Sequence, residues 1–351
     1  MPPVYPSPTN VVVPNMEATN RLVVDFARNI NEFPVLRYTQ IVPVKSVTGL
    51  FLRMTVEEAG RILSSDLSEF VWPDGQDAPI GLDNTESFQF ETYRAERYAF
   101  TAALGERTQE AAQWDIVGQQ ASIKARQAMT ARTVLAAAKI FNQNLYPATH
   151  VINVQSTFGA YWSAATTSNL VIRKSLNAAV QKIIDDTLGA VRPKDLILLI
   201  SDTVARAIAE SQEFSDYLKG SPDALGALRY QFKDDSTLPN AFGLPKRLYG
   251  LEVVVDDTRK VVSKKKASSP TIEPVLPGTQ AAVISRVGAL EAPYSPVAFS
   301  TCMFFMKDEM KVENVFDQIN KRTLIRVIED YDCQLVAPAT GVLLTNVLAS
   351  S

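Results

Sequence analysis

A long stretch without helix breakers is the feature that most constrains this chain. Residues 119–144 contain neither glycine nor proline and include seven alanines, with glutamine, lysine, arginine and methionine between them. These residue types have high helix propensity, so the stretch predicts one helix of about 40 Å that ends before Pro147. Ala121, Ala125 and Ala128 share one stripe of that helix, where small side chains permit close packing.

The net charge changes sign along this part of the chain. Residues 113–143 have one acidic side chain, Asp115, and a net charge of +3. The basic side chains are Lys124, Arg126, Arg132 and Lys139. Residues 61–112 carry ten acidic and four basic side chains, a net charge of −6. The two segments are electrostatically matched, which indicates docking of an acidic surface on a basic one.

Two strand-like stretches bracket a loop within the acidic segment. Residues 47–54 and 87–93 alternate with the period of a strand, whereas residues 57–86 hold few regular elements and include the turn signal Trp72-Pro73-Asp74-Gly75. They predict a projecting two-stranded arm, which is marginal alone and needs a partner surface. The alternative is a solvated acidic loop. The candidate docking residues are Asp66, Glu69, Trp72, Asp74 and Asp77.

A compact α/β region follows the long helix. Apolar residues recur at helical spacing from Ile172 to Leu188, and Gly189 is a natural end for that helix. Apolar runs predict buried strands over 196–200, 251–255 and 281–285. The other elements expected here are a helix capped by Ser201 or Asp202 that runs to Glu210, and a helical turn over 214–218.

One basic run interrupts this region. Its residues are Arg259, Lys260, Lys264, Lys265 and Lys266. We interpret it as a solvated hairpin tip, and the alternative is a contact with phosphate or with an acidic neighbour.

The two ends of the chain differ in character. Residues 1–20 are proline-rich and predict an extended arm, followed by a helical patch over 22–26 and an extended stretch through Pro34 and Pro43. The C-terminal part is β-rich, and Asp330-Tyr331-Asp332 is expected to turn one strand into the next. The expected strands there are 299–306, 323–328, 334–337 and 342–347.

The composition excludes several classes of protein. The chain has 351 residues, 46% hydrophobic and 21% charged, as in a globular protein. Its net charge of −3 disfavours a generally basic nucleic-acid binder. No run approaches the ~18 apolar residues of a membrane span, and we expect neither a signal peptide nor a membrane partner. Cys302 and Cys333 are too few for a disulfide framework or a zinc site, so we expect reduced core thiols.

The motifs of catalysis are missing from the sequence. It holds no Walker P-loop, no GxGxxG after a strand, and neither HExxH nor GxSxG. His150 is the single histidine, so any Ser–His–Asp mechanism must use it. The pair Asp256-Asp257 after a strand is more typical of a turn or cap than of a metal site. We therefore predict no catalytic residue, no cofactor and no metal; the rival is an α/β enzyme that uses Asp256 or His150.

The order of these elements resembles the major capsid protein of tailed double-stranded-DNA bacteriophages, the Hong Kong 97-type fold. The resemblance covers nearly the whole chain and rests on order more than on individual residues. Four segments carry the resemblance. The first is the N-terminal arm followed by the acidic arm, and the second is Phe88-Gln89-Phe90-Glu91-Thr92-Tyr93 before the long helix. The third is the strand–helix unit 195–220 with the later strand segment 248–257, and the fourth is Arg326-Val327-Ile328-Glu329-Asp330-Tyr331-Asp332.

This resemblance implies an α+β phage major-capsid fold with an N-terminal arm, an extended two-stranded loop, a long spine helix, and peripheral and axial α/β domains. The implied ranges are 1–45 for the N-terminal arm, 46–112 for the extended loop, 113–171 for the spine helix and first part of the peripheral domain, 172–296 for the axial domain, and 297–351 for the C-terminal strands of the peripheral domain.

The resemblance also implies a structural protein of the virion, not an enzyme. The subunit would self-assemble into the icosahedral capsid shell around a double-stranded DNA phage genome, in the host bacterial cytoplasm. Its implied partners are other copies in hexamers and pentamers, a separate scaffolding protein, a portal protein, a decoration protein, and packaged DNA held by non-specific contact. Lys124, Arg126, Arg132 and Lys139 are then inter-subunit or DNA-facing candidates.

Some members of this family lock the shell with a Lys–Asn isopeptide bond through the extended loop. No lysine occurs between Lys45 and Lys124, so the arm lacks the amine and we predict a non-covalent shell. The alternatives are an encapsulin-like nanocompartment shell protein, the α/β enzyme, and a virion accessory protein or other oligomeric binding module.

Overall fold

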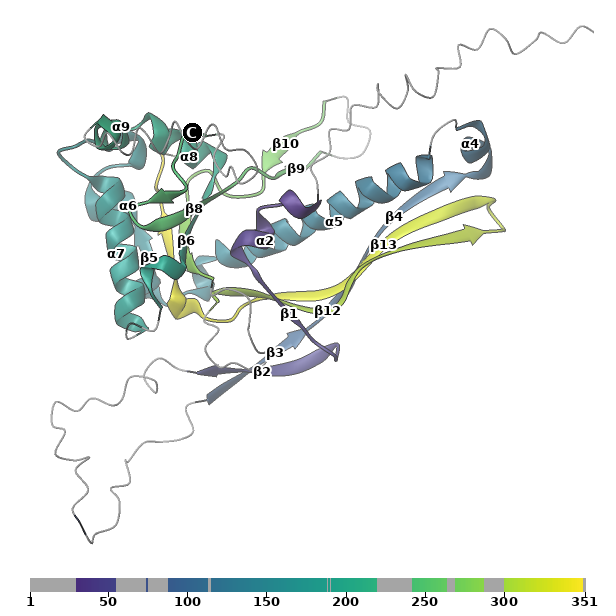
Figure 1. The fold of residues 1–351 in the computed structure, drawn as a ribbon, viewed down its shortest axis with the longest axis horizontal. Coiled ribbons are helices and arrows are strands. Elements are labelled where there is room, and N and C mark those ends of the chain that lie inside the picture. The colour runs from purple at the N-terminus through teal and green to yellow at the C-terminus, as the bar shows by residue number, and fades with distance from the viewer. Residues whose placement is uncertain are drawn as a thin grey trace, which may run out of the picture. The chain divides into compact units, whose positions relative to one another are not determined.

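The computed structural model describes residues 30–54, 74, 88–112, 115–187, 189, 191–219, 242–263, 269–286 and 300–349. The predictions for the N-terminal arm, for Lys264, Lys265 and Lys266, and for Asp66, Glu69, Trp72 and Asp77 lie outside these residues. The described chain is α+β, as predicted, and falls into two compact units (Figure 1). Unit 1 comprises described residues within 98–128 and 310–329, and unit 2 those within 31–97, 129–309 and 330–351.

A six-stranded mixed sheet forms the centre of unit 2, in the order β5-β14-β11-β6-β8-β7. The predicted buried strands are confirmed as β6 (Leu196–Ser201), β8 (Leu251–Asp256) and β11 (Ala281–Ser285), with β6 parallel to β8 and antiparallel to β11. The outer strands are β5 (Val151–Asn153), β7 (Arg247–Leu248) and β14 (Gly341–Thr345). β5 and β14 thus join this sheet from outside residues 172–296.

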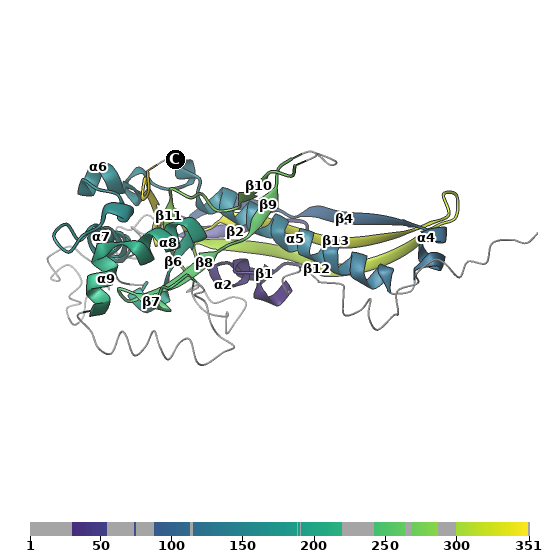
Figure 2. The same ribbon diagram turned by 90° about the horizontal axis from the view of Figure 1, so that it is seen from above.

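Helices pack on one face of this sheet (Figure 2). They are α6 (Val154–Phe158), α7 (Val171–Asp186), α8 (Asp202–Glu210) and α9 (Gln212–Lys219). Leu196, Leu198 and Ile200 of β6 share a buried cluster with α7, while Ile197 and Leu199 are buried on the opposite face. Burial of both faces explains why the strand is a continuous apolar run instead of an alternating one.

Local capping explains where these helices begin and end. Ser201 accepts the Val204 N–H at the start of α8, as predicted. Gly189, which follows the end of α7, has a φ of +75° and donates its N–H to the carbonyl of Ile184 in the last turn of that helix. Buried Glu213 accepts the N–H groups of Ile172 and Arg173 and so satisfies the first turn of α7.

The remaining strands include two long ones that contribute to both units. β12 (Cys302–Asp317) and β13 (Arg322–Leu335) belong to a four-stranded sheet of order β1-β12-β13-β4, with β1 (Gln40–Pro43) and β4 (Glu96–Gly105). β2 (Thr48–Met54) pairs antiparallel with β3 (Phe88–Arg94), which confirms the two strands predicted for the arm. β9 (Arg259–Val261) and β10 (Ile272–Pro274) form a hairpin.

The long helix is confirmed as α5 (Ile116–Ile140). In unit 1, Ala125 and Ala128 pack with Val327, Phe100 and Met310, so the small-residue stripe does permit close packing. The helix starts earlier than predicted because Gly118 is accommodated in its first turn, where its N–H donates to Asp115. It ends earlier because the chain turns into a 3₁₀ helix over Gln143–Leu145, capped by Asn142.

Short helical elements complete the described chain. The expected extended stretch through Pro34 and Pro43 is wrong over Val35–Tyr38, where the chain forms α2 with Val35 and Tyr38 buried, and is confirmed over Gln40–Pro43, which is β1. α4 (Glu106–Ala111) follows β4. The other 3₁₀ helices are Ile30–Glu32, Ala148–His150, Trp162–Ala164, Pro193–Asp195 and Pro338–Thr340. None of the described helices has the length and apolar character needed to cross a membrane.

The turn expected at Asp330-Tyr331-Asp332 is wrong, because β13 runs unbroken through it. Asp330 accepts two hydrogen bonds from the guanidinium of Arg97, at 2.8 Å each, and Asp332 accepts the Arg94 N–H. Carboxylates that usually favour turns therefore remain in a strand, since basic and backbone donors of β3 and β4 satisfy them.

Candidate functional site

The four predicted cations of α5 are all engaged within their own chain. Lys124 donates to Gln127 at 2.9 Å and Arg126 donates to Ser122 at 3.0 Å. Lys139 donates to Gln334 of β13 at 3.2 Å. Arg132 is buried, with its guanidinium carbon 5.5 Å from the centroid of the Tyr331 ring. A ligand on α5 therefore has to share or displace internal contacts.

Of the five docking candidates in the extended loop, Asp74 is described, and it is an exposed turn residue. The base of that loop is well defined. Tyr93 of β3 lies opposite Gly49 of β2 and stacks on Phe305 of β12, with ring centroids 4.7 Å apart. Phe51 stacks on the same ring at 5.2 Å. Three aromatic rings therefore hold the β2–β3 pair against β12.

Gly49 makes this stack sterically feasible. A Cβ at position 49 would lie 2.4 Å from the Tyr93 Oη and 2.6 Å from two carbons of the ring. The absent side chain lets the ring cover the backbone of the neighbouring strand. The strand alternation indicated the arm, but nothing in the local sequence indicated its partner on β12.

His150, the residue that any triad would need, is completely buried and held from two sides. Nδ1 lies 2.8 Å from the Gly341 carbonyl oxygen, and Nε2 lies 2.6 Å from Asp186 Oδ2. Both ring nitrogens are thus used in joining three elements, the 3₁₀ helix at 148–150, α7 and β14. This arrangement has the character of a structural joint and leaves neither nitrogen available as a base.

Asp186 gives this joint a dependence on pH. Partial burial works against the charged form, but hydrogen bonds from Lys182 and His150 outweigh it and lower the pKa of Asp186. The carboxylate therefore stabilises the fold above the ordinary aspartate pKa of about 3.9, and the stabilisation is lost as the pH falls through the lower folded-state value.

Replacing Asp186 by asparagine is expected to lower the melting temperature at neutral pH, because the charge-assisted bonds to His150 and Lys182 are lost. The difference from the wild type should persist down to the ordinary aspartate pKa of about 3.9, and should shrink as the pH falls below it through the lowered pKa of Asp186. Thermal unfolding across this range measures it. Asp185→Asn, at the exposed neighbouring position, is the matched control. A gap that stays constant with pH would contradict this role for Asp186.

Asp256, the other residue of the rival enzyme hypothesis, is also buried and engaged. Its carboxylate accepts the Tyr38 hydroxyl at 2.9 Å and the Thr258 N–H at 2.9 Å. Burial raises the pKa of Asp256, and burial together with the neighbouring carboxylate raises that of Tyr38. The contact fastens α2 to β8. Across the described ranges, no three His, Cys, Asp or Glu side chains gather in the manner of a metal site.

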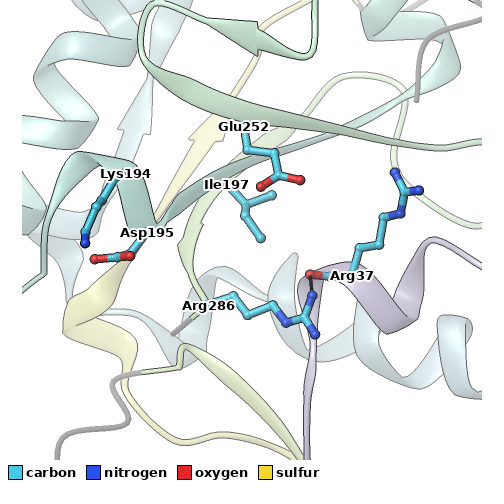
Figure 3. A pocket seen from close by; sticks show the side chains of 6 residues that line it. All are labelled: Arg37, Lys194, Asp195, Ile197, Glu252 and Arg286. Carbon is cyan, nitrogen blue, oxygen red and sulfur yellow. Dashed lines mark hydrogen bonds between the residues drawn. The ribbon is translucent and has the colours of Figure 1, made fainter. Parts of the chain in front are cut away.

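A charged pocket of about 270 Å³ lies beside β6 and β8 in unit 2 (Figure 3). The guanidinium of Arg286 donates to the Arg37 carbonyl, and the Glu252 carboxylate points into the same space. Burial lowers the pKa of Arg286 despite the opposing effect of Glu252. The pocket therefore marks a polar joint between α2 and the sheet. Its described lining is Arg37, Lys194, Asp195, Ile197, Glu252 and Arg286.

The two cysteines lie together in the structure. Cys302 Sγ and Cys333 Sγ are 3.6 Å apart, and both residues are buried as free thiols, as expected. The hydrogen bond between the thiols and their burial raise the pKa of Cys333. The sequence had no signal for this proximity, because thirty residues, made up of parts of β12 and β13 and the turn between them, separate the two positions.

Comparisons with known proteins rest on structure. No family model matches the sequence, and no curated protein matches it. A phage-related protein of Bordetella bronchiseptica has a similar structure, with a TM-score of 0.63 and 14% identity over 92% of this chain and 95% of that chain. The capsid structure of the cyanophage P-SCSP1u gives a TM-score of 0.51 and 12% identity over 99% of each chain.

A structure from Mycobacterium phage Bobi gives a TM-score of 0.52, with 11% identity over 93% of each chain. The expected resemblance to phage capsid proteins is therefore confirmed at the level of the fold. The matches extend over nearly the full length of the chain and of the proteins compared, so both units belong to the shared architecture.

Proposed function

We propose that this chain is a structural subunit of a phage capsid, which self-assembles into a closed icosahedral shell around a double-stranded DNA genome. The observation that supports it most is the fold shared over 99% of the chain with the cyanophage capsid structure. Hexamers and pentamers would form the shell, with a portal protein at one vertex, a separate scaffolding protein during assembly in the host cytoplasm, and a decoration protein on the outside.

The surface of the chain supports a role in assembly. Residues 311–316 of β12 are all exposed, and Ile319 at the turn after the strand is 93% exposed. Val312, Val315 and Phe316 are exposed on the same strand. These four exposed apolar side chains lie within eight residues of the chain, and exposed apolar surface of this kind is typical of protein interfaces. A subunit inside a shell would bury them against its neighbours.

The described interior supports a structural role instead of a catalytic one. His150 and Asp256, the groups on which an enzyme would depend, are both buried and bonded within the fold. The four α5 cations remain candidates for contact with packaged DNA or with a neighbour. Their surroundings favour weak, repeated contacts, since each exposed ion pair contributes only ~0–1 kcal/mol. Weak contacts of this size allow a wrongly placed subunit to dissociate again while the shell assembles.

Sedimentation and negative-stain microscopy of the purified chain, alone and with a candidate scaffolding protein, test this proposal. We expect closed shells when the scaffold is present, and no covalent ladders after denaturation, because the arm has no lysine between Lys45 and Lys124. A stable monomer or dimer under both conditions, without rings, would contradict the shell function. Nucleic acid in particles from infected cells would separate a virion from an enzyme-filled nanocompartment.

A further inference from the structure

Two free thiols lie in contact inside unit 2. Cys302 Sγ of β12 and Cys333 Sγ of β13 are 3.6 Å apart, about the contact distance of two sulfur atoms. Cys302 is 1% exposed and Cys333 is 3% exposed, so both side chains are enclosed by protein. A disulfide has an S–S bond of about 2.05 Å, so the two sulfurs need to approach by only roughly 1.5 Å to form one.

Backbone hydrogen bonds fix the chain just before Cys302. The Thr301 N–H donates to the Ser285 carbonyl at 3.0 Å, and the Thr301 carbonyl accepts the Val336 N–H at 3.0 Å. The Thr301 hydroxyl also lies 2.9 Å from the hydroxyl of Thr340. Residue 301 thus joins the end of β11, the start of β12 and the segment after β13, and Cys302 begins its strand from a fixed position.

The residues on either side of Cys333 are held as well. Asp332 accepts the Arg94 N–H at 2.9 Å, and Gln334 accepts a hydrogen bond from the Lys139 ammonium at 3.2 Å. β13 is therefore tied to β3 by the residue before Cys333 and to α5 by the residue after it. Two thiols that are both held in place lose little further freedom when they bond, which favours a bond within the chain over one between chains.

A structural metal site does not account for this pair. Such a site takes four ligands around a zinc ion, and within the described ranges no further His, Cys, Asp or Glu side chain joins the two sulfurs in a metal-binding group. The chemistry left to two adjacent thiols is oxidation.

The surroundings make that oxidation slow. The hydrogen bond between the thiols and their burial raise the pKa of Cys333, and the nearby Lys139 opposes this only in part. The thiolate is the form that reacts, so little of the pair is reactive at neutral pH. The pair therefore stays reduced in a reducing compartment and responds to prolonged contact with an oxidant small enough to enter the core.

We propose that Cys302 and Cys333 are a latent disulfide, which closes within one chain when hydrogen peroxide reaches it and which stabilises the folded chain. One thiolate attacks a peroxide oxygen, the O–O bond breaks, and a sulfenic acid and one water are produced after proton transfer. The second sulfur then attacks the sulfenic sulfur, the S–O bond breaks, and another water leaves. Two thiols and one peroxide thus give one disulfide and two waters, with sulfur oxidised and oxygen reduced.

The bond would close the chain across the base of the β12–β13 hairpin. Its loop spans residues 302–333, and cross-linking a loop of this length reduces the conformational freedom of the unfolded chain. The melting temperature is expected to rise by roughly 5 °C in a chain of this size. The bond joins no second copy, so it is compatible with a non-covalent shell, and it does not depend on the proposed function.

Counting the free thiols of the full-length chain tests the proposal. The folded protein is incubated with hydrogen peroxide at a dose that removes both thiols from the chain unfolded in denaturant. It is then desalted, denatured and treated with a maleimide. The untreated chain should take up two maleimides, and the oxidised chain should take up none until a reductant is added. Peptide mapping should identify the Cys302–Cys333 link, and a gel without reductant should show monomers.

Three results of that experiment would overturn the proposal. The first is that the folded chain keeps both thiols. The second is that the thiols are lost but are not recovered on reduction, which indicates sulfinic or sulfonic acid. The third is that covalent dimers form, which places the bond between chains.

Cys333→Ala separates the disulfide from other effects of peroxide, such as oxidation of methionine. Each protein's melting temperature is compared with that of its own untreated sample, so a loss of stability from the substitution itself cancels. The wild type should gain roughly 5 °C and lose this gain on reduction, whereas Cys333→Ala should gain nothing. Cys302→Ala is the matched variant on the other strand, with the same expected result. An equal gain in the variants, or no gain in the wild type, would contradict the stabilising bond.

Discussion

Replacing Gly49 by alanine is expected to detach the β2–β3 pair from β12 and to impair assembly strongly. The added Cβ would lie 2.4–2.6 Å from atoms of the Tyr93 ring. That ring cannot move aside easily, because it is buried and stacked on Phe305 at 4.7 Å. Overpacking of this kind typically costs about 1–3 kcal/mol, and here the cost falls on the aromatic contact that holds the β2–β3 pair on β12.

Hydrogen exchange of β2 and β3, together with the assembled fraction, measures the effect of Gly49→Ala. Gly105→Ala is the matched control, since a Cβ there meets its nearest neighbour, the Thr108 hydroxyl, at 3.8 Å. We expect faster exchange in β2 and β3 with little change in the six-stranded sheet. Normal protection of β2 and β3 together with normal assembly would contradict the role assigned to the aromatic stack.

Replacing Trp162 by alanine is expected to lower the free energy of unfolding by about 3–5 kcal/mol. Trp162 is completely buried in the main core cluster of unit 2, and its indole N–H donates to Ser175 Oγ at 3.0 Å. Its removal leaves a large cavity beside α7. Marginal stability makes such a loss sufficient to unfold much of the protein or to drive it into aggregates.

Trp162→Phe separates packing from hydrogen bonding at this site. Phenylalanine keeps most of the volume and loses the N–H donor, so a loss of about 1 kcal/mol is expected. Chemical denaturation of both variants measures the two contributions. A loss below about 1.5 kcal/mol for Trp162→Ala would show that the surrounding side chains collapse into the space.

Much of the fold could be predicted from local sequence patterns. The strands β6, β8 and β11 are apolar runs between caps and turns, and their bounds were predicted to within about one residue. α7 and α5 followed from periodicity and propensity. The wrong predictions came from contacts between residues that are distant in sequence. Asp330 and Asp332 indicated a turn, because the donors that hold them in a strand lie more than two hundred residues away.

The sequence also indicated some features of the candidate site, whereas others depend on contacts that are distant in sequence. Composition located the cations of α5, but their internal partners on β13, such as Gln334 and Tyr331, are distant in sequence. The basic run was interpreted as a hairpin tip, and the hairpin at its base is confirmed. The exposed apolar pair of this hairpin, Val261 opposite Ile272, depends on a ladder register that one strand alone does not specify.

The position of β14 in the sheet has a consequence for synthesis of the protein. β14 comes from residues 341–345, yet it lies between β11 and β5, which emerge from the ribosome much earlier. Until it arrives, both of those strands keep an unpaired edge, and His150 lacks the Gly341 carbonyl. Nascent chains crowded on one messenger RNA therefore hold an unfinished sheet, and pairing between the open strands of different chains is a hazard until β14 has left the ribosome and joined its own sheet.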